Sequence, residues 1–147
     1  MIPPATPRPA TFPRGLTAMG IFLVFGACMA SLAGLTLAFP GTALDRIWLL
    51  NPRAYKQLAP LGKEVSALFL LLAVALATAA AGWFKRRVWG RRLAIAIIAI
   101  QIAGDSVNAL SGHLIEGGIG VAIASALLFY LLRAEVKNAF AAAEPRK

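Results

Sequence analysis

Long apolar segments alternate with short polar connections along this chain and predict four membrane-spanning helices. The segments cover residues 16–39, 65–84, 93–111 and 117–133. A helix that crosses a bilayer needs a run of about 17 to 25 mostly apolar residues, and each segment has such a length. We therefore expect an all-α protein in which residues 15–143 form a bundle of four transmembrane helices.

The two ends of the chain do not share this pattern. Residues 1–14 hold five prolines and no apolar period, which predicts a disordered tail, and residues 144–147 form a second short tail. A cleaved secretory signal is an alternative for the first span, because Arg8 and Arg14 precede it. The apolar run is much longer than the roughly 7 to 15 residues of a signal peptide, so we expect an uncleaved anchor.

The loop between the first two spans is unusually apolar and predicts short helices of its own. Thr42 and Asp45 have the spacing of a capping box, and Asn51 followed by Pro52 is typical of a helix start. We expect two short amphipathic helices in this first outer loop, lying on the membrane surface.

Positive charge is concentrated between the second and third spans. Five Lys and Arg residues lie between positions 85 and 92, and this connection and the two terminal tails carry eleven together. The loop at 40–63 carries four, and the turn between the third and fourth spans carries none. The excess of positive charge on cytoplasmic loops places both termini in the cytoplasm, and we expect a multi-pass protein of a bacterial inner membrane.

Small residues recur at intervals of four in three of the spans. Such strips let helix backbones approach closely, so they predict helix packing within the bundle or with another subunit. The strips are Gly26, Ala30 and Gly34 in the first span, Ala73, Ala77 and Ala81 in the second, and Gly118 and Ala122 in the fourth.

The third span carries a polar stripe formed by Gln101, Asp105 and Asn108, which fall on one face of a helix. An ionisable group is costly in hydrocarbon, so Asp105 is a candidate functional residue. It either binds and releases a proton or cation, or forms interhelical hydrogen bonds that fix the position of the helix. We favour the structural role, because polar side chains in spans often connect helices.

The first outer loop offers Arg46 and Arg53 as counter-charges for Asp105. In one hypothesis the loop is a lid over Asp105, and in the other it is a connector packed over the bundle. We favour the connector, because exposed loop cations are common and their ion pairs contribute little.

Composition narrows the function further. The chain is 59% hydrophobic and 14% charged, so the lipid bilayer is its principal surroundings. The net charge of +9 lies beside the apolar segments, and we expect no nucleic-acid partner. With one His, one Cys and no metal-binding, phosphate-binding or nucleophile motif, we expect no metal, no cofactor and no enzymatic activity.

Three stretches together resemble small four-span bacterial membrane proteins of unknown function. They are the run from Pro40 to Pro52, the Arg-Arg-x-Trp-Gly-Arg-Arg turn from Arg86 to Arg92, and Gly104-Asp105-x-x-Asn108. The resemblance covers about residues 16–140 and supports the fold. It implies that the outer loop and Asp105 belong to one arrangement, and it implies no catalytic residue.

These features predict a non-enzymatic accessory, scaffold or assembly subunit of a larger membrane complex, which docks on other membrane subunits or on a second copy of itself. The alternative is a small proton- or cation-coupled transporter that works through Asp105. A membrane enzyme ranks third, because a single carboxylate without a nucleophile or metal set offers little chemistry.

Overall fold

The structure is a computed structural model that describes residues 14–143. Of the two predicted tails, residues 1–13 and 144–147 lie outside the described residues, and Arg14, which was assigned to the first tail, begins a helix instead. The described part is helical and contains no strand, which confirms the predicted all-α fold. Its elements are α1 (Arg14–Ala38), η1 (Ala43–Leu50), α2 (Pro52–Leu58), η2 (Ala59–Leu61), α3 (Gly62–Phe84), α4 (Val88–Leu110), α5 (Leu114–Leu132) and α6 (Ala134–Ala141).

Four of these helices, α1, α3, α4 and α5, are long and apolar enough to cross a membrane. All four begin before the apolar segments that predicted them: α1 at Arg14, α3 at Gly62, α4 at Val88 and α5 at Leu114. Hydropathy marks only the part that crosses the bilayer, whereas Lys and Arg are good helix formers and let the helix extend beyond it. The chain is therefore a multi-pass membrane protein by helix length and composition.

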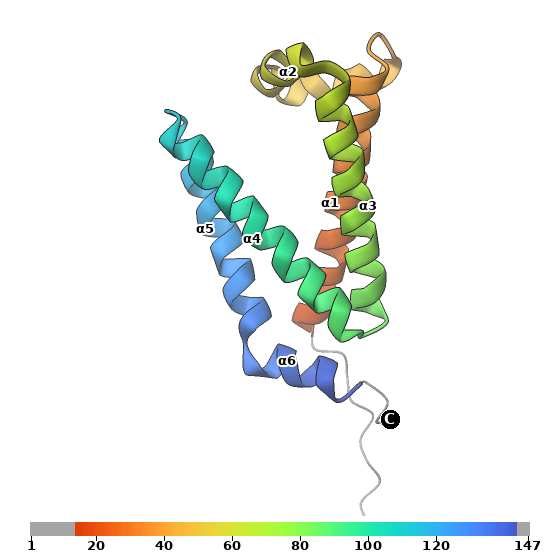
Figure 1. Ribbon diagram of the computed structural model, residues 1–147, viewed down its shortest axis with the longest axis vertical. Coiled ribbons are helices and arrows are strands. Elements are labelled where there is room, and N and C mark those ends of the chain that lie inside the picture. The colour runs from red at the N-terminus through yellow and green to blue at the C-terminus, as the bar shows by residue number, and fades with distance from the viewer. Residues whose placement is uncertain (1–13, 144–147) are drawn as a thin grey trace, which may run out of the picture.

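The four long helices form two hairpins. The first consists of α1 packed along α3, and the second of α4 packed along α5 (Figure 1). The hairpins meet where α3 turns into α4, and they diverge toward the opposite end. We call the end of the molecule that holds residues 85–92 and 133–137 the basic end, and the end that holds residues 40–64 and 111–116 the capped end.

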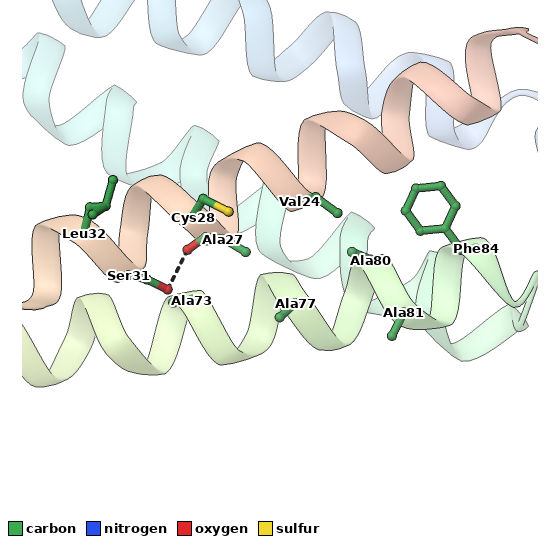
Figure 2. A pocket seen from close by; sticks show the side chains of 10 residues that line it. All are labelled: Val24, Ala27, Cys28, Ser31, Leu32, Ala73, Ala77, Ala80, Ala81 and Phe84. Carbon is green, nitrogen blue, oxygen red and sulfur yellow. Dashed lines mark hydrogen bonds between the residues drawn. The ribbon is translucent and has the colours of Figure 1, made fainter.

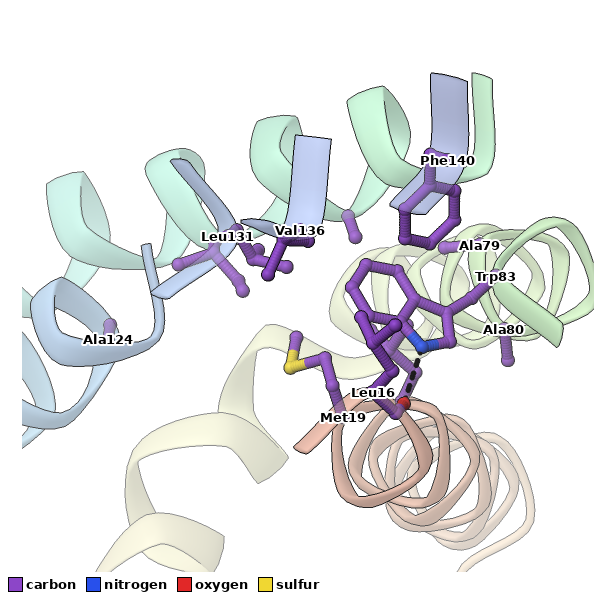
Figure 3. Close-up of a cluster of buried hydrophobic side chains, with 12 residues drawn as sticks. Leu16, Met19, Ala79, Ala80, Trp83, Ala124, Leu131, Val136 and Phe140 are labelled. Carbon is purple, nitrogen blue, oxygen red and sulfur yellow. Dashed lines mark hydrogen bonds between the residues drawn. The ribbon is translucent and has the colours of Figure 1, made fainter. Parts of the chain in front are cut away.

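The core is concentrated near the basic end, around Trp83. This side chain is fully buried, and its indole N–H donates a hydrogen bond of 2.7 Å to the carbonyl oxygen of Leu16 on α1 (Figure 3). The ring of Phe140 on α6 packs against it, with ring centroids 4.7 Å apart. Residues from both hairpins and from α6 thus share one apolar cluster.

The end of α5 corrects one prediction. No helix breaker follows the fourth span before Pro145, so the sequence alone predicts that this helix continues through Phe140. In the structure α5 ends at Leu132 and the chain turns at Arg133, which has extended backbone angles (φ −57°, ψ 142°). α6 then lies across the basic end (Figure 1). Val136 and Phe140 lie four residues apart on one face of α6, and the turn lets both be buried.

α3 and α4 cross at two glycines, Gly82 and Gly90. A Cβ atom placed on Gly90 would lie 2.7 Å from the Cα of Gly82 and 2.7 Å from the backbone nitrogen of Trp83. The two backbones are therefore in contact, and any larger residue would force the helices apart. This contact is the close crossing that holds the two hairpins together at the basic end.

The turn that ends α3 contains a strained residue. Arg87 N–H donates to the carbonyl oxygen of Gly82, and Arg86 N–H donates to that of Trp83, both at 2.9 Å. These bonds form a Schellman motif, whose left-handed position is usually glycine. Here Arg86 occupies it, with φ of 51°.

α4 ends in the same motif with the usual residue. His113 N–H donates to the carbonyl oxygen of Asn108 and Gly112 N–H donates to that of Ala109, both at 3.3 Å. Gly112 takes the left-handed position with φ of 101°. A residue with a Cβ costs about 1 to 2 kcal/mol more in this conformation, so the turn at Arg86 is the strained one of the two.

The capped end is built from the two predicted short helices. Trp48 of η1 donates from its indole nitrogen to Thr36 Oγ1 at 3.0 Å, and its ring lies 5.4 Å from that of Tyr55 on α2. The predicted cap of α2 is confirmed, since Asn51 Oδ1 accepts from the N–H of Ala54 at 3.1 Å. These contacts fasten the short helices to the end of the α1–α3 hairpin.

The predicted capping box is wrong in detail. Thr42 makes no side-chain capping bond, and the segment that follows it is a 3-10 helix. The carboxylate of Asp45 accepts instead from the N–H of Gly41 at 2.6 Å. Gly41 adopts a left-handed conformation (φ 90°), which turns its N–H toward Asp45, one residue before the expected partner.

Candidate functional site

Asp105 lies at the interface between α4 and α5. Its Oδ1 accepts a hydrogen bond of 3.0 Å from Nε2 of Gln101, one turn earlier on the same helix. A Cβ atom placed on Gly120 of α5 would lie 2.6 Å from the carboxyl carbon of Asp105, so the absence of a side chain at Gly120 makes room for this carboxylate. Gly117, one turn earlier on α5, similarly packs against the backbone of Asp105 and Ala109. The side chain of Asp105 is half-buried between α4 and α5.

The candidate counter-charges lie elsewhere. Arg53 forms an ion pair of 3.6 Å with Glu116, in the first turn of α5, and both side chains are largely exposed. Among residues 14–143 this is the one ion pair, so neither Arg46 nor Arg53 pairs with Asp105. In the structure, α2 is linked to the start of α5 and not to the polar stripe.

The three residues of the polar stripe have different surroundings. Asp105 packs on α5, whereas the side chains of Gln101 and Asn108 are exposed on the surface of the described chain. Asn108 lies two residues from the end of α4. Gln101 lies nine residues from that end, about 13 Å along the helix at 1.5 Å per residue, and therefore deep within the apolar region.

Gln101 lies on the wall of a cleft between the two hairpins. Two cavities of about 410 and 580 Å³ lie there, and Leu72, Ile97 and Gln101 line both. We call the two cavities together the interhairpin cleft. Its wall is otherwise almost entirely apolar and includes Met29, Trp48, Leu68, Leu71, Leu76 and Ile100.

The position of Gln101 is energetically unusual. A side-chain amide carries two N–H donors and an acceptor oxygen, and in Gln101 one hydrogen bond to Asp105 uses only part of this capacity. Leaving an amide without partners in an apolar environment costs about 1 to 3 kcal/mol by protein mutational data. The arrangement can therefore accept a hydrogen-bonding group that enters the cleft from outside the described chain.

A second, shallower groove runs along the other side of the α1–α3 hairpin (Figure 2). Its volume is about 710 Å³, and Ala77 and Ala81 are exposed in it, while Ala73 is buried against α1. The hydroxyl of Ser31, which also lines it, donates to the carbonyl oxygen of Ala27 at 2.8 Å. This groove contains the predicted strip of the second span but offers little polar chemistry.

The strip of the first span packs inside the molecule. Ser66 on α3 donates to the carbonyl oxygen of Gly34 at 2.8 Å, and a Cβ atom on Gly34 would lie 2.8 Å from the side chain of Leu70. Ala30 is buried, and Gly26 faces Leu76 at an ordinary contact distance of 3.4 Å. These residues let α1 and α3 run side by side.

The strip of the fourth span faces outward. No atom lies within 4 Å of a Cβ placed on Gly118, and Ala122 is exposed. The neighbouring face of α5, with Gly117, Gly120 and Ala124, makes the contacts with the rest of the bundle instead. The role of Gly118 and Ala122 in helix packing thus remains a prediction about a partner.

Two glycines that shape the fold, Gly82 and Gly90, were not singled out from the sequence. Gly82 lies four residues before Arg86 and Gly90 lies four residues after it. Two glycines at equal distances from a tight turn allow the helices on either side of the turn to cross closely, and this was the signal available in the sequence. The glycine-rich run Gly117-Gly118-x-Gly120 at the start of the fourth span predicts close packing from the sequence alone, and Gly117 and Gly120 make such contacts with α4.

The described residues show no metal centre. No group of three or more His, Cys, Asp or Glu side chains lies close enough together in residues 14–143 to hold an ion. The single histidine, His113, has Gln57 as its neighbour, with 3.5 Å between Nε2 of each side chain.

Comparison with known proteins adds no family assignment. No family model matches the chain, and no curated protein or solved structure is significantly similar to it.

Proposed function

We propose that this protein is a non-enzymatic accessory or assembly subunit that holds a transmembrane helix of another membrane subunit in the interhairpin cleft. The observation that carries this proposal is Gln101, an exposed amide placed deep along a membrane helix, on the wall of an otherwise apolar cleft. The distribution of Lys and Arg supports a bacterial inner membrane location with both termini in the cytoplasm.

The chemistry of the cleft favours a polypeptide over lipid as its occupant. Lipid tails have no donor or acceptor for the amide of Gln101, whereas a partner helix offers polar side chains and carbonyl groups. Interhelical hydrogen bonds of this kind contribute about 0.6 to 2 kcal/mol in membranes. The apolar remainder of the wall, including Leu72 and Ile97, supplies packing surface for the same helix.

Site-specific photo-crosslinking tests the proposal. A photoreactive residue is placed at Ile100, which lines the cleft and is 73% exposed, and as a control at Phe129 on α5, which is 74% exposed. We expect position 100 to capture a transmembrane segment of one other protein, and Gln101→Leu to reduce that capture while Gln57→Leu does not. Crosslinks from position 100 to lipid alone, or to the same proteins as position 129, would contradict the proposal.

The alternative function is coupled transport of a proton or cation through Asp105. One observation favours it: this carboxylate has no ion pair within residues 14–143 and is bonded to Gln101, which faces the cleft. Flux measured in proteoliposomes distinguishes the two functions. A flux that Asp105→Asn abolishes and Glu64→Asn leaves intact supports transport, and a flux unaffected by Asp105→Asn excludes this mechanism.

Membrane orientation is tested independently by reporter fusions. We expect a fusion after Lys147 to report a cytoplasmic location, and a fusion inserted at Gly112 in the α4–α5 turn to report the opposite side. The reverse pattern would place the capped end in the cytoplasm.

A further inference from the structure

The two ends of the molecule differ sharply in charge. The basic end carries seven Lys and Arg side chains and one carboxylate, Glu135. The segments 40–64 and 111–116 at the capped end carry four Lys and Arg side chains and three carboxylates. An excess of this size over so few residues attracts a negatively charged ligand to the basic end.

The fold brings the two segments of the basic end together. Nε and Nη2 of Arg91 on α4 both donate to the carbonyl oxygen of Leu131, at 3.1 and 2.9 Å. This bond joins the start of α4 to the end of α5, two residues before Arg133. Arg133 and Lys137 lie one turn apart where α6 begins and are both exposed, and α6 contacts α4.

The start of α4 reinforces this positive surface. The first N–H groups of a helix have no acceptor within it, and a helix N-terminus favours anions. α4 is 23 residues long, and Arg87 directly precedes it. Trp89 in its first turn is 47% exposed, as is common for aromatic residues that lie at the level of lipid headgroups.

The backbone at Arg86 is a separate observation. The equivalent position of the other Schellman motif is Gly112, which fits the left-handed conformation without strain. An arginine at this position is unfavourable for the turn itself. The conformation of the turn therefore does not explain why this position holds an arginine.

We propose that the basic end binds the phosphate group of an anionic phospholipid, held between the first turns of α4 and the α5–α6 junction. The ligand is a lipid because these cations lie directly at the ends of membrane-spanning helices, beside Trp89, at the surface of one leaflet. Arginine and lysine side chains on two elements surround the phosphate, and the helix N-terminus faces it. The site is independent of the interhairpin cleft.

Retention of lipid by the purified full-length protein tests this proposal. Protein in mixed micelles containing phosphatidylglycerol and phosphatidylcholine is analysed by native mass spectrometry. The test variant combines Arg92→Gln, Arg133→Gln and Lys137→Gln, and the matched control combines Arg46→Gln, Lys56→Gln and Lys63→Gln, which removes the same charge from exposed residues at the capped end.

We expect wild type to retain phosphatidylglycerol over phosphatidylcholine, and the test variant to lose this preference by roughly tenfold or more, since each basic residue near a charged surface strengthens binding about fivefold. The control should change less than about twofold. A second variant that combines Arg92→Lys and Arg133→Lys keeps the charge and should retain the lipid, which separates an effect of charge from an effect on folding. Helical content measured by circular dichroism identifies any variant that has unfolded.

Three outcomes would overturn the proposal. The first is equal loss of lipid in test and control variants, which indicates general charge attraction. The second is displacement of the lipid by an equal concentration of inorganic phosphate, which makes free phosphate the ligand. The third is co-purification of RNA with wild type in place of phosphatidylglycerol.

Discussion

The basic end and the capped end are built from the same four helices, yet one is closely packed and the other is open. At the basic end the backbones of Gly82 and Gly90 touch, and Trp83 is fully buried. At the capped end the hairpins contact each other through an ion pair of 3.6 Å and a side-chain contact of 3.5 Å, all among exposed residues. The difference shows that a close glycine crossing can join two hairpins whose far ends meet through exposed polar side chains.

The largest effect should follow from removing the side chain at the centre of the packed end. Trp83→Ala deletes a buried indole together with its bond to Leu16, and we expect a loss of about 3 to 5 kcal/mol of unfolding free energy. Trp48→Ala at the capped end removes a half-buried indole and should cost less than half as much. Unfolding in mixed detergent micelles measures both, and equal losses would show that the two ends are equally important for stability.

A larger side chain at the crossing of α3 and α4 should have the next largest effect on stability. Gly90→Leu places atoms within the backbone contact to Gly82, and overpacking of this kind costs about 1 to 3 kcal/mol. The control is Gly118→Leu, since nothing lies within 4 Å of that position. A stability for Gly90→Leu as high as that of Gly118→Leu would mean that the helices do not cross at this point.

Relieving the strain in the turn at Arg86 should stabilise the protein instead of destabilising it. Arg86→Gly removes a Cβ from the left-handed position, and we expect it to stabilise the fold by up to about 1 kcal/mol, because part of the gain is offset by the greater freedom of glycine when unfolded. Gly112→Ala should destabilise by a similar amount. Thermal unfolding followed by circular dichroism reports both, and a destabilised Arg86→Gly variant would show that the side chain contributes more than the strain removes.

The smallest effect should come from the contact between the hairpins at the capped end. Glu116→Gln breaks the ion pair with Arg53, but both side chains are largely exposed, so solvent screens the attraction and the expected change is below about 0.5 kcal/mol. Double electron–electron resonance between spin labels at Leu50 and Leu110 then measures the width of the opening. A narrow distance distribution that Glu116→Gln broadens would show that this pair holds the capped end closed.

The sequence predicted the elements of the fold better than their arrangement. Apolar length reveals a membrane helix directly, and Asn51 followed by Pro52 marks a helix start by local chemistry alone. The turn at Arg133 depends on burial of Phe140 against Trp83, which is a contact between residues far apart in the chain. Such contacts leave no periodic signal.

The polar site shows the same limit. Spacing correctly placed Gln101 and Asp105 on one side of a helix, and the structure bonds them to each other. Spacing did not reveal which neighbour would face each residue, because lipid and apolar side chains are similar surroundings for a membrane helix. For this reason the interval of four selected Gly118, whereas Gly120 is the glycine that faces Asp105.

The glycine crossing also has a mechanical consequence. Gly82 lies 20 residues from the start of α3 and Gly90 lies 20 residues from the end of α4, which is about 30 Å of helix in each case, so a rotation of about 10° at this crossing would move the far ends by about 5 Å. The contact between Gly82 and Gly90 is therefore the point about which the two hairpins would rotate relative to each other. The residues that set the width of the interhairpin cleft are thus at the opposite end of the molecule from its opening.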